Sequence, residues 1–121
     1  MKRILIADDQ ATARELLKTV LSGAGYQVFE AIDGNDAVAR AAELRPDLIL
    51  LDIHMPGKTG FEVCDFVRNH SDLSTTPIIA ITAGLMSGER ERALSAGFTE
   101  FVSKPVSISA LRLTVARLLA G

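Results

Sequence analysis

Five polar residues stand at the ends of apolar runs in this 121-residue sequence. Asp8 and Asp9 follow the first run, Asp52 ends the third, Thr82 ends the fourth, and Lys104 follows the fifth. Carboxylates, a hydroxyl and an ammonium group can together bind a metal ion and a phosphate. If the runs are neighbouring strands of a parallel sheet, the five side chains lie at one edge, where open α/β sheets place their chemistry.

The charges of these residues predict their ligands. Two like charges about 4 Å apart repel by roughly 4 kcal/mol at an effective dielectric near 20. Lys104 neutralises one of three carboxylates, and a divalent cation matches the remaining two. Oxygen ligands without a Cys or His cluster favour Mg²⁺ over zinc, and Mg²⁺ commonly adds a phosphate to its carboxylates. Asp52 is the natural nucleophile because carboxylates form acyl phosphates, and the Thr82 hydroxyl could bond a phosphate oxygen.

Each of these residues, taken alone, also has a purely structural explanation. Asp8 and Asp9 could cap a helix and supply its acidic first turn. Asp52 could bond only the N–H groups of its own loop, Thr82 favours strands in general, and Lys104 could belong to a simple turn. Their joint occurrence at successive strand ends is what favours a functional site.

The pattern of the chain predicts five alternations of strand and helix. The apolar run Leu48–Leu51 is typical of a strand buried on both faces, as in a parallel sheet covered by helices. The predicted strands are Ile4–Ala7, Tyr26–Ala31, Leu48–Asp52, Pro77–Thr82 and Glu100–Ser103. The predicted helices are Ala11–Ala24, Asn35–Leu44, Phe61–His70, Ser87–Ala96 and Ser107–Leu119. Such alternation implies a parallel sheet with helices on both faces.

Local signals mark several helix ends. Thr12 and Glu15 have the spacing of a capping box near the start of the first helix, and Gly23 with Gly25 offers its stop. Pro46 marks the end of the second helix. The fourth helix is rich in charge and has a thin apolar face, which is typical of a lightly packed helix.

The composition indicates one globular domain over residues 1–121. Apolar residues make up 48% and charged residues 23%, and the formal net charge is −2. No basic run is present to neutralise phosphates, so direct nucleic-acid binding is not expected. Cys64 is expected to be a small core residue. The sequence contains no signal peptide and no run of membrane-spanning length, which favours a reducing, cytoplasmic setting.

Four segments of the chain carry a family resemblance: ILIADD at the start, LILLDIHMPGKTG around Asp52, IIAITA around Thr82 and FVSKPV around Lys104. In this order and spacing the chain resembles the receiver domain of two-component response regulators over essentially its whole length. The resemblance implies an α/β fold with a doubly wound five-stranded parallel sheet in the order 2-1-3-4-5, the flavodoxin-like (βα)5 arrangement.

The resemblance also implies roles for individual residues. Asp52 is expected to be the phosphoacceptor. Asp8 and Asp9 would form the acidic pair that binds Mg²⁺, Asp9 directly and Asp8 mainly through water. The backbone carbonyl of His54 would be the third protein ligand, whereas its ring is more simply a loop side chain.

Three further implications concern the last two strands. Lys104 would pair with the phosphoryl group, and the Lys104–Pro105 bond is expected to be cis. Thr82 and Phe101 match the switch pair, in which phosphorylation draws Thr82 toward the phosphoryl oxygens and turns Phe101 inward. A phenylalanine cannot donate a hydrogen bond, so switching at Phe101 would rest on packing alone.

Weaker features of the resemblance lie after the third strand and in the fourth β-α segment. His54 and Gly84 occupy the variable positions that tune dephosphorylation in the family. Similarity to receivers of the stand-alone cell-cycle type and of hybrid kinases rests on Met86, Gly88, Glu91 and Ala96-Gly97.

The expected function is a phosphorylation-dependent signalling switch. A sensor histidine kinase or a histidine phosphotransfer protein would phosphorylate Asp52, and a downstream protein would bind the face formed by Ser87–Ala96, Glu100–Ser103 and Ser107–Leu119. The chain would not be an enzyme beyond its own phosphoryl transfer and slow autodephosphorylation. It would act alone through protein partners or as one domain of a longer protein, since the sequence ends shortly after the fifth helix.

Two other functions remain open from the residues alone. A small phosphohydrolase would use an aspartyl nucleophile, but His54 stands where the second Asp of its D-x-D motif belongs, and no cap insertion is present. A flavin carrier of the same topology would need a phosphate-binding loop after the first strand, where Asp8, Asp9 and Gln10 would repel the phosphate.

Overall fold

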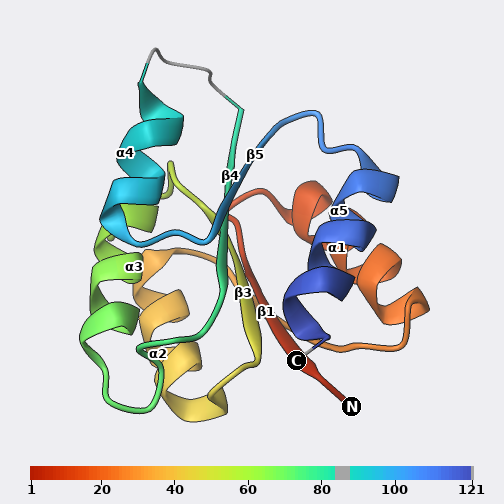
Figure 1. Cartoon of the computed structure of the whole chain (residues 1–121), viewed down its shortest axis with the longest axis horizontal. Helices are drawn as coiled ribbons and strands as arrows, with labels where there is room; N and C mark the ends of the chain where they lie inside the picture. Colours follow the sequence, from red (N-terminus) through yellow and green to blue (C-terminus); the bar gives the residue numbers. More distant parts are fainter. Residues whose placement is uncertain (84–87, 121) are drawn as a thin grey trace.

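Strands and helices alternate throughout the described residues, 1–83 and 88–120, of the computed structural model (Figure 1). The strands are β1 (Arg3–Ala7), β2 (Gln27–Ala31), β3 (Leu48–Asp52), β4 (Ile78–Thr82) and β5 (Glu100–Ser103). The helices are α1 (Ala11–Gly23), α2 (Gly34–Leu44), α3 (Gly60–Asn69), α4 (Glu89–Ala96) and α5 (Ile108–Leu119). The predicted alternation is confirmed.

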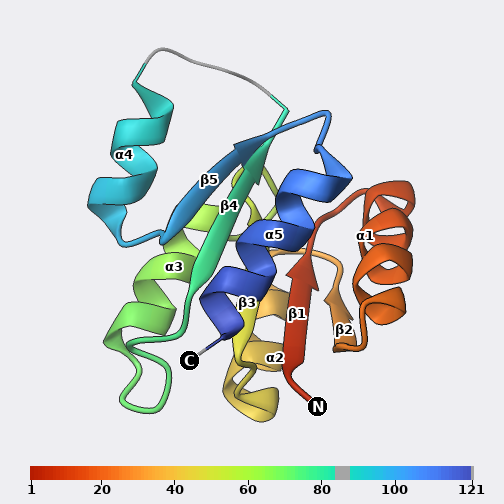
Figure 2. The same cartoon turned by 45° about the vertical axis from the view of Figure 1, so that its right-hand side comes forward.

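The strands form one parallel sheet in the order β2-β1-β3-β4-β5, as predicted. In Figures 1 and 2, α1 and α5 cover one face of this sheet, and α2, α3 and α4 cover the other. Because every pair of neighbouring strands is parallel, all carboxyl ends lie along one edge. The order reverses at β1 and β3, and a doubly wound sheet has its crevice at such a point.

The central strand β3 connects two hydrophobic cores. Leu48 and Leu50 pack into the core beneath α1 and α5, whereas Ile49 and Leu51 pack into the core beneath α2, α3 and α4. Successive side chains of a strand point to opposite faces of the sheet. All four side chains are fully buried because helices cover both faces. The continuous apolar run therefore places Asp52 at the end of a strand that is buried on both faces.

The predicted capping box of the first helix is wrong. The N-cap of α1 is Gln10, which makes no side-chain cap, and Thr12 lies inside the first turn. The helix ends at Gly23, and Gly25, with φ of 96°, follows the C-cap in the left-handed region. Asp8 explains why the helix begins at Ala11, before Thr12 could cap it. Asp8 Oδ1 accepts a hydrogen bond from the Gln10 N–H, and this bond turns the chain there.

A capping box forms instead at α3. The Thr59 side chain accepts a hydrogen bond from the Glu62 N–H, and the Glu62 side chain accepts one from the Thr59 N–H. This reciprocal pair satisfies two N–H groups that a helix start leaves without partners. It fixes the start of the helix that directly follows the loop after Asp52.

The fourth helix is short, and its buried residues are Glu89 and Ala93. The sequence predicted its start at Ser87, which lies outside the described residues, as do Gly84 and Met86. Cys64 is fully buried on α3, and burial raises the pKa of its thiol, which agrees with the predicted core role.

Candidate functional site

Three carboxylates converge at the carboxyl edge of the sheet. Asp8, Asp9 and Asp52 each offer an oxygen, and these oxygens lie within 4.8 Å of one another. Ala7 and Leu51 are register partners in the sheet, so the residues that follow them emerge side by side. Asp8 and Asp52 are buried, whereas Asp9 is exposed. The predicted convergence of residues far apart in sequence is therefore present.

Lys104 connects the end of β5 to these acids. Its Nζ lies 3.0 Å from Asp8 Oδ2 and 3.7 Å from Asp52 Oδ2. Its backbone N–H donates a 2.7 Å hydrogen bond to the carbonyl of Thr82, which is fully buried at the end of β4. The lysine thus supplies the compensating charge, and the sheet brings Thr82 to the same edge.

The environment of Asp52 opposes its negative charge. Burial raises the pKa of Asp52 above its ordinary value of 3.8, and the negative charges of Asp8 and Asp9 raise it further. The His54 N–H, which donates to Asp52 Oδ1 over 3.0 Å, and the Lys104 ammonium act in the opposite direction. A cation placed among the carboxylates would relieve this penalty.

Asp8 is held more firmly than Asp9. Its Oδ1 accepts a hydrogen bond from the Gln10 N–H, its Oδ2 pairs with Lys104, and its carbonyl accepts a 2.7 Å hydrogen bond from Arg14 Nη1. The explanation as a simple acidic helix start is wrong, because α1 has no acidic residue in its first turn and Gln10 is its cap. An exposed Asp9 beside a constrained Asp8 agrees with a direct and an indirect metal ligand.

The donor set fits magnesium. Asp8, Asp9 and Asp52 provide carboxylate oxygens, the ligands that Mg²⁺ prefers, at one partly open edge. The loop after Asp52 runs along this edge, since the His54 N–H bonds to Asp52. The roles of the His54 carbonyl and of each carboxylate toward a metal ion stay predictions.

Two of the features that the resemblance implies lie at β5, and one of them is present. The Lys104–Pro105 peptide bond is cis, as expected. Phe101, the register partner of Ala80, is only 8% exposed and belongs to the core beneath α3 and α4. The ring therefore already lies inward in this structure, and its predicted turn on phosphorylation stays a prediction.

Sequence reasoning missed a contact beneath the site. A Cβ on Gly60 would lie 2.7 Å from Ile53 Cα and 2.8 Å from the Asp52 carbonyl oxygen. The first residue of α3 must therefore be a glycine for the helix to approach the main chain after β3 so closely. The signal was present in the sequence as a glycine directly after the capping threonine.

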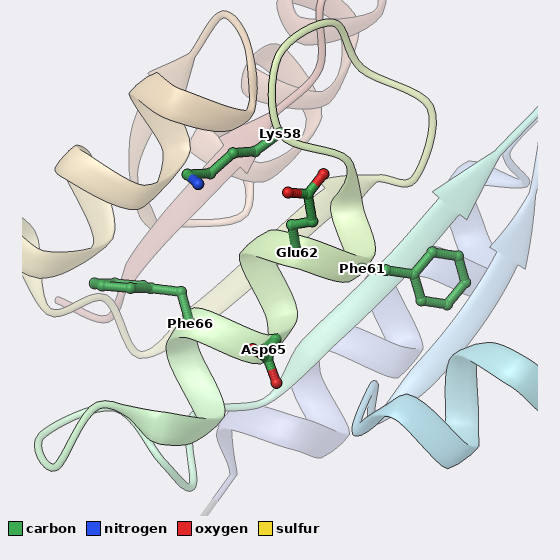
Figure 3. Close-up of a pocket in the computed structure, with 5 residues that line it drawn as sticks. All are labelled: Lys58, Phe61, Glu62, Asp65 and Phe66. Carbon is green, nitrogen blue, oxygen red and sulfur yellow. The ribbon is translucent and has the colours of Figure 1, made fainter.

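The surface depressions are lined by residues other than Asp8, Asp9 and Asp52. One of about 500 Å³ is lined by the outer face of α3 and the residue Lys58 before it (Figure 3), and it contains none of the strand-end residues. Another of about 210 Å³ lies between α1 and the segment after β5 and borders Lys104. No helix among the described residues has both the length and the apolar character needed to cross a membrane.

A doubly wound parallel sheet with an acidic site at its carboxyl edge defines a flavodoxin-like α/β domain with a candidate magnesium site. Residues 4–116 match the response regulator receiver domain. The chain belongs to this family, which is consistent with a phosphorylation-activated switch.

Named relatives and solved structures agree with this assignment. The polar-differentiation response regulator DivK of Brucella anthropi is 35% identical over 107 residues, which cover 88% of this chain and 87% of the relative. The structure of chemotaxis response regulator CheY4 of Vibrio cholerae is 34% identical with a TM-score of 0.91, covering 98% of this chain and 99% of that chain.

A third similar structure contains a metal ion. The receiver domain of sensor histidine kinase PA1611 from Pseudomonas aeruginosa is 30% identical with a TM-score of 0.91, and the match covers 99% of this chain and 98% of that one. That structure has a magnesium ion coordinated in its active site cleft.

Proposed function

We propose that this receiver domain is switched by phosphorylation of Asp52, with Mg²⁺ as the cofactor. The observation that supports this most is the convergence of Asp8, Asp9 and Lys104 on a buried aspartate at the end of the central strand. The donor would be the phosphohistidine of a sensor histidine kinase or of a histidine phosphotransfer protein. A cytoplasmic location follows from that donor.

The chemistry is transfer of one phosphoryl group. A carboxylate oxygen of Asp52 attacks the phosphorus, the phosphorus–nitrogen bond of phosphohistidine breaks, and the imidazole of the donor leaves with the bond electrons. Asp8, Asp9 and Asp52 would hold Mg²⁺, whose charge would offset the negative charge of the phosphoryl oxygens. The Lys104 ammonium, which already lies near Asp8 and Asp52, pairs with the added phosphoryl group. The Thr82 hydroxyl donates a hydrogen bond to a phosphoryl oxygen.

The chain would catalyse only its own phosphorylation and slow dephosphorylation. Asp52 lies in a partly open site beside the exposed Asp9, and His54 stands where the D-x-D motif of aspartyl phosphohydrolases has its second aspartate. We therefore expect no steady turnover of phosphate monoesters. A colourless purified protein would likewise agree with a receiver rather than a flavin carrier.

The downstream protein would bind the face formed by α4, β5 and α5. Phe101 on β5 connects this face to the core, and α4 has only Ala93 as a buried apolar contact. Leu94 and Leu113 are 41% and 73% exposed on α4 and α5. A lightly packed helix beside exposed leucines offers a surface whose shape can change with the state of Asp52.

The phosphoryl donor would dock beside Lys104. The 210 Å³ depression there is lined mainly by apolar side chains of α1 and the segment after β5: Ala13, Leu16, Leu17, Lys104, Pro105 and Val106. Leu16 is 51% exposed at its edge. A donor protein held against this apolar rim would bring its phosphohistidine to the carboxyl edge of the sheet.

Leu16→Glu is expected to slow phosphotransfer from a phosphohistidine protein about tenfold, because a charge placed in the apolar rim of the contact costs about 1.4 kcal/mol. Phosphorylation by acetyl phosphate, which needs no docking surface, is expected to stay unchanged. The matched control is Leu94→Glu, the same change at a comparably exposed leucine of α4. Equal transfer rates for both variants would refute the donor surface.

Phosphotransfer profiling tests the proposed function as a whole. Purified sensor kinases and phosphotransfer proteins, labelled on histidine, are mixed briefly with this chain and Mg²⁺. We expect rapid transfer of label from one or a few of them, and acid-stable, base-labile label on the chain. Absence of label from every donor and from acetyl phosphate would contradict the proposal.

A further inference from the structure

Glu89 is a buried charge outside the site described above. The buried polar or charged residues of the described part of the chain are Asp8, Asp52, Thr82 and Glu89. The first three belong to the strand-end site. Glu89 is the first residue of α4 and is only 2% exposed. Charged side chains are almost never fully buried without a partner, so this position requires a reason.

The partner of Glu89 is His54, two residues after Asp52. Glu89 Oε2 lies 3.3 Å from His54 Nε2, and the His54 backbone N–H donates to Asp52 Oδ1 over 3.0 Å. His54 therefore connects the first turn of α4 to the expected phosphoacceptor. Arg92 and Phe61 make a further contact between α4 and α3, but this contact does not involve Asp52.

The other oxygen of Glu89, Oε1, is buried and has no hydrogen-bond partner in the described part of the chain. A buried polar atom left without a partner destabilises the fold, because its hydrogen bond to water is lost and not replaced. The His54 contact and the positive end of the helix dipole at α4 offset this cost. Some interactions favour burial of Glu89 and others oppose it, so a change of charge nearby can release the side chain.

We propose that Glu89 is a positioning residue that ties α4 to the phosphoacceptor loop through His54, and that its negative charge opposes phosphorylation of Asp52. This inference rests on the proposed function. It adds the residue through which the state of Asp52 and the position of α4 are coupled.

The charge added to Asp52 determines whether phosphorylation strengthens or weakens the contact between Glu89 and His54. Phosphorylation replaces the single negative charge of Asp52 by a phosphoryl group of about −1.5 to −2. Among residues 1–83 and 88–120, His54 connects the added charge to Glu89. The charge makes burial of Glu89 less favourable, so phosphorylation favours release of the first turn of α4 from His54. By thermodynamic reciprocity, removing the charge of Glu89 must make a phosphoryl group at Asp52 more favourable.

This role has a signature that a purely structural role lacks. If Glu89 merely helped α4 to fold, its replacement would weaken binding of both Mg²⁺ and a phosphoryl mimic. If its charge matters as proposed, replacement weakens binding of the cation and strengthens binding of the anion. The two affinities then change in opposite directions.

The test uses Glu89→Gln, an isosteric change, in the full chain. Isothermal titration measures the dissociation constant first for Mg²⁺ and then for beryllofluoride, an anionic phosphoryl mimic, at saturating Mg²⁺. We expect binding of beryllofluoride to be about fivefold tighter in Glu89→Gln than in the unsubstituted chain, and binding of Mg²⁺ to be about twofold weaker. The amide signal of Ala93 is expected to shift toward its beryllofluoride-bound position before any ligand is added.

Glu91→Gln is the matched control, because it removes the same charge from an exposed position of the same helix. It is expected to leave both affinities unchanged. Glu89→Met provides a second neutral side chain of similar length and is expected to behave like Glu89→Gln. If the unsubstituted chain binds beryllofluoride but both Glu89 variants bind it equally or less tightly, the inference is overturned and the proposed function stands. If the unsubstituted chain binds no beryllofluoride, both fall.

Discussion

Asp52→Asn is expected to abolish phosphorylation of the chain by acetyl phosphate and Mg²⁺. The amide oxygen is a poor nucleophile and cannot form the acyl phosphate, while its size and its acceptor for the His54 N–H are retained. Intact-protein mass spectrometry checks this result as the loss of the mass gain of one phosphoryl group. Asp65→Asn, at an exposed position on α3, is the control and is expected to be phosphorylated normally.

The Asp52→Asn variant is also expected to be more stable than the unsubstituted chain at neutral pH without Mg²⁺, by about 1 kcal/mol, or a few degrees in melting temperature. Burial, Asp8 and Asp9 raise the pKa of Asp52 in the folded state, so the charged carboxylate destabilises the fold once the pH exceeds that pKa. The stability advantage of the variant should therefore shrink as the pH falls through the raised pKa and vanish below the ordinary pKa of 3.8, where the carboxyl binds a proton in both the folded and the unfolded state. Thermal melts across this pH range measure it.

Two outcomes would contradict these expectations. A phosphoryl mass gain that persists in Asp52→Asn would place the phosphoacceptor elsewhere. A variant less stable than the unsubstituted chain at neutral pH would show that Asp52 is a structural acid that bonds its own loop, which is the alternative that the residue alone leaves open.

The second large effect is expected from the loss of magnesium. At a Mg²⁺ concentration about a hundred times its dissociation constant, the unsubstituted chain should gain about 2.7 kcal/mol in unfolding free energy. Asp9→Asn removes an exposed carboxylate from the cluster, so this gain and phosphorylation by acetyl phosphate should both be lost at the same Mg²⁺ concentration. Denaturant melts with and without Mg²⁺ measure the first, and mass spectrometry measures the second.

Two controls distinguish specific binding of Mg²⁺ from the general screening of charges by salt. The same melts at matched ionic strength with K⁺ in place of Mg²⁺ should show almost no gain, because a monovalent ion does not satisfy the cluster. Asp65→Asn should keep the full magnesium response. A full response in Asp9→Asn would mean that the ion binds away from the three converging carboxylates.

The sheet and its site could be predicted from the sequence because both depend on strong, redundant patterns. The apolar run of β3 required a strand buried on two faces, and parallel order then brought Asp8, Asp9, Asp52 and Lys104 to one edge. Each residue alone had a structural alternative. Their successive placement at strand ends was sufficient because a parallel sheet has only one carboxyl edge.

The features that could not be predicted are contacts made through tertiary structure. The T-x-x-E spacing occurs at both Thr12 and Thr59, and only the turn made by Asp8 decides that the first is not a cap. Glu89 resembles the other charges of a polar helix in the sequence, and its burial depends on where His54 lies. Arg14 reaches the Asp8 carbonyl only because α1 begins at Ala11.

The placement of helices on both faces of the sheet has a consequence for the binding of partner proteins. The apolar rim beside Lys104 is built on α1, whereas α4 lies on the opposite face of the sheet (Figure 1). A protein seated on α1 therefore leaves α4 uncovered. The segment after β5, however, lines the same rim and leads into α5, which covers the same face of the sheet as α1. On the proposed surfaces, a downstream protein would therefore contact the whole of α4, β5 and α5 only after the phosphoryl donor has left.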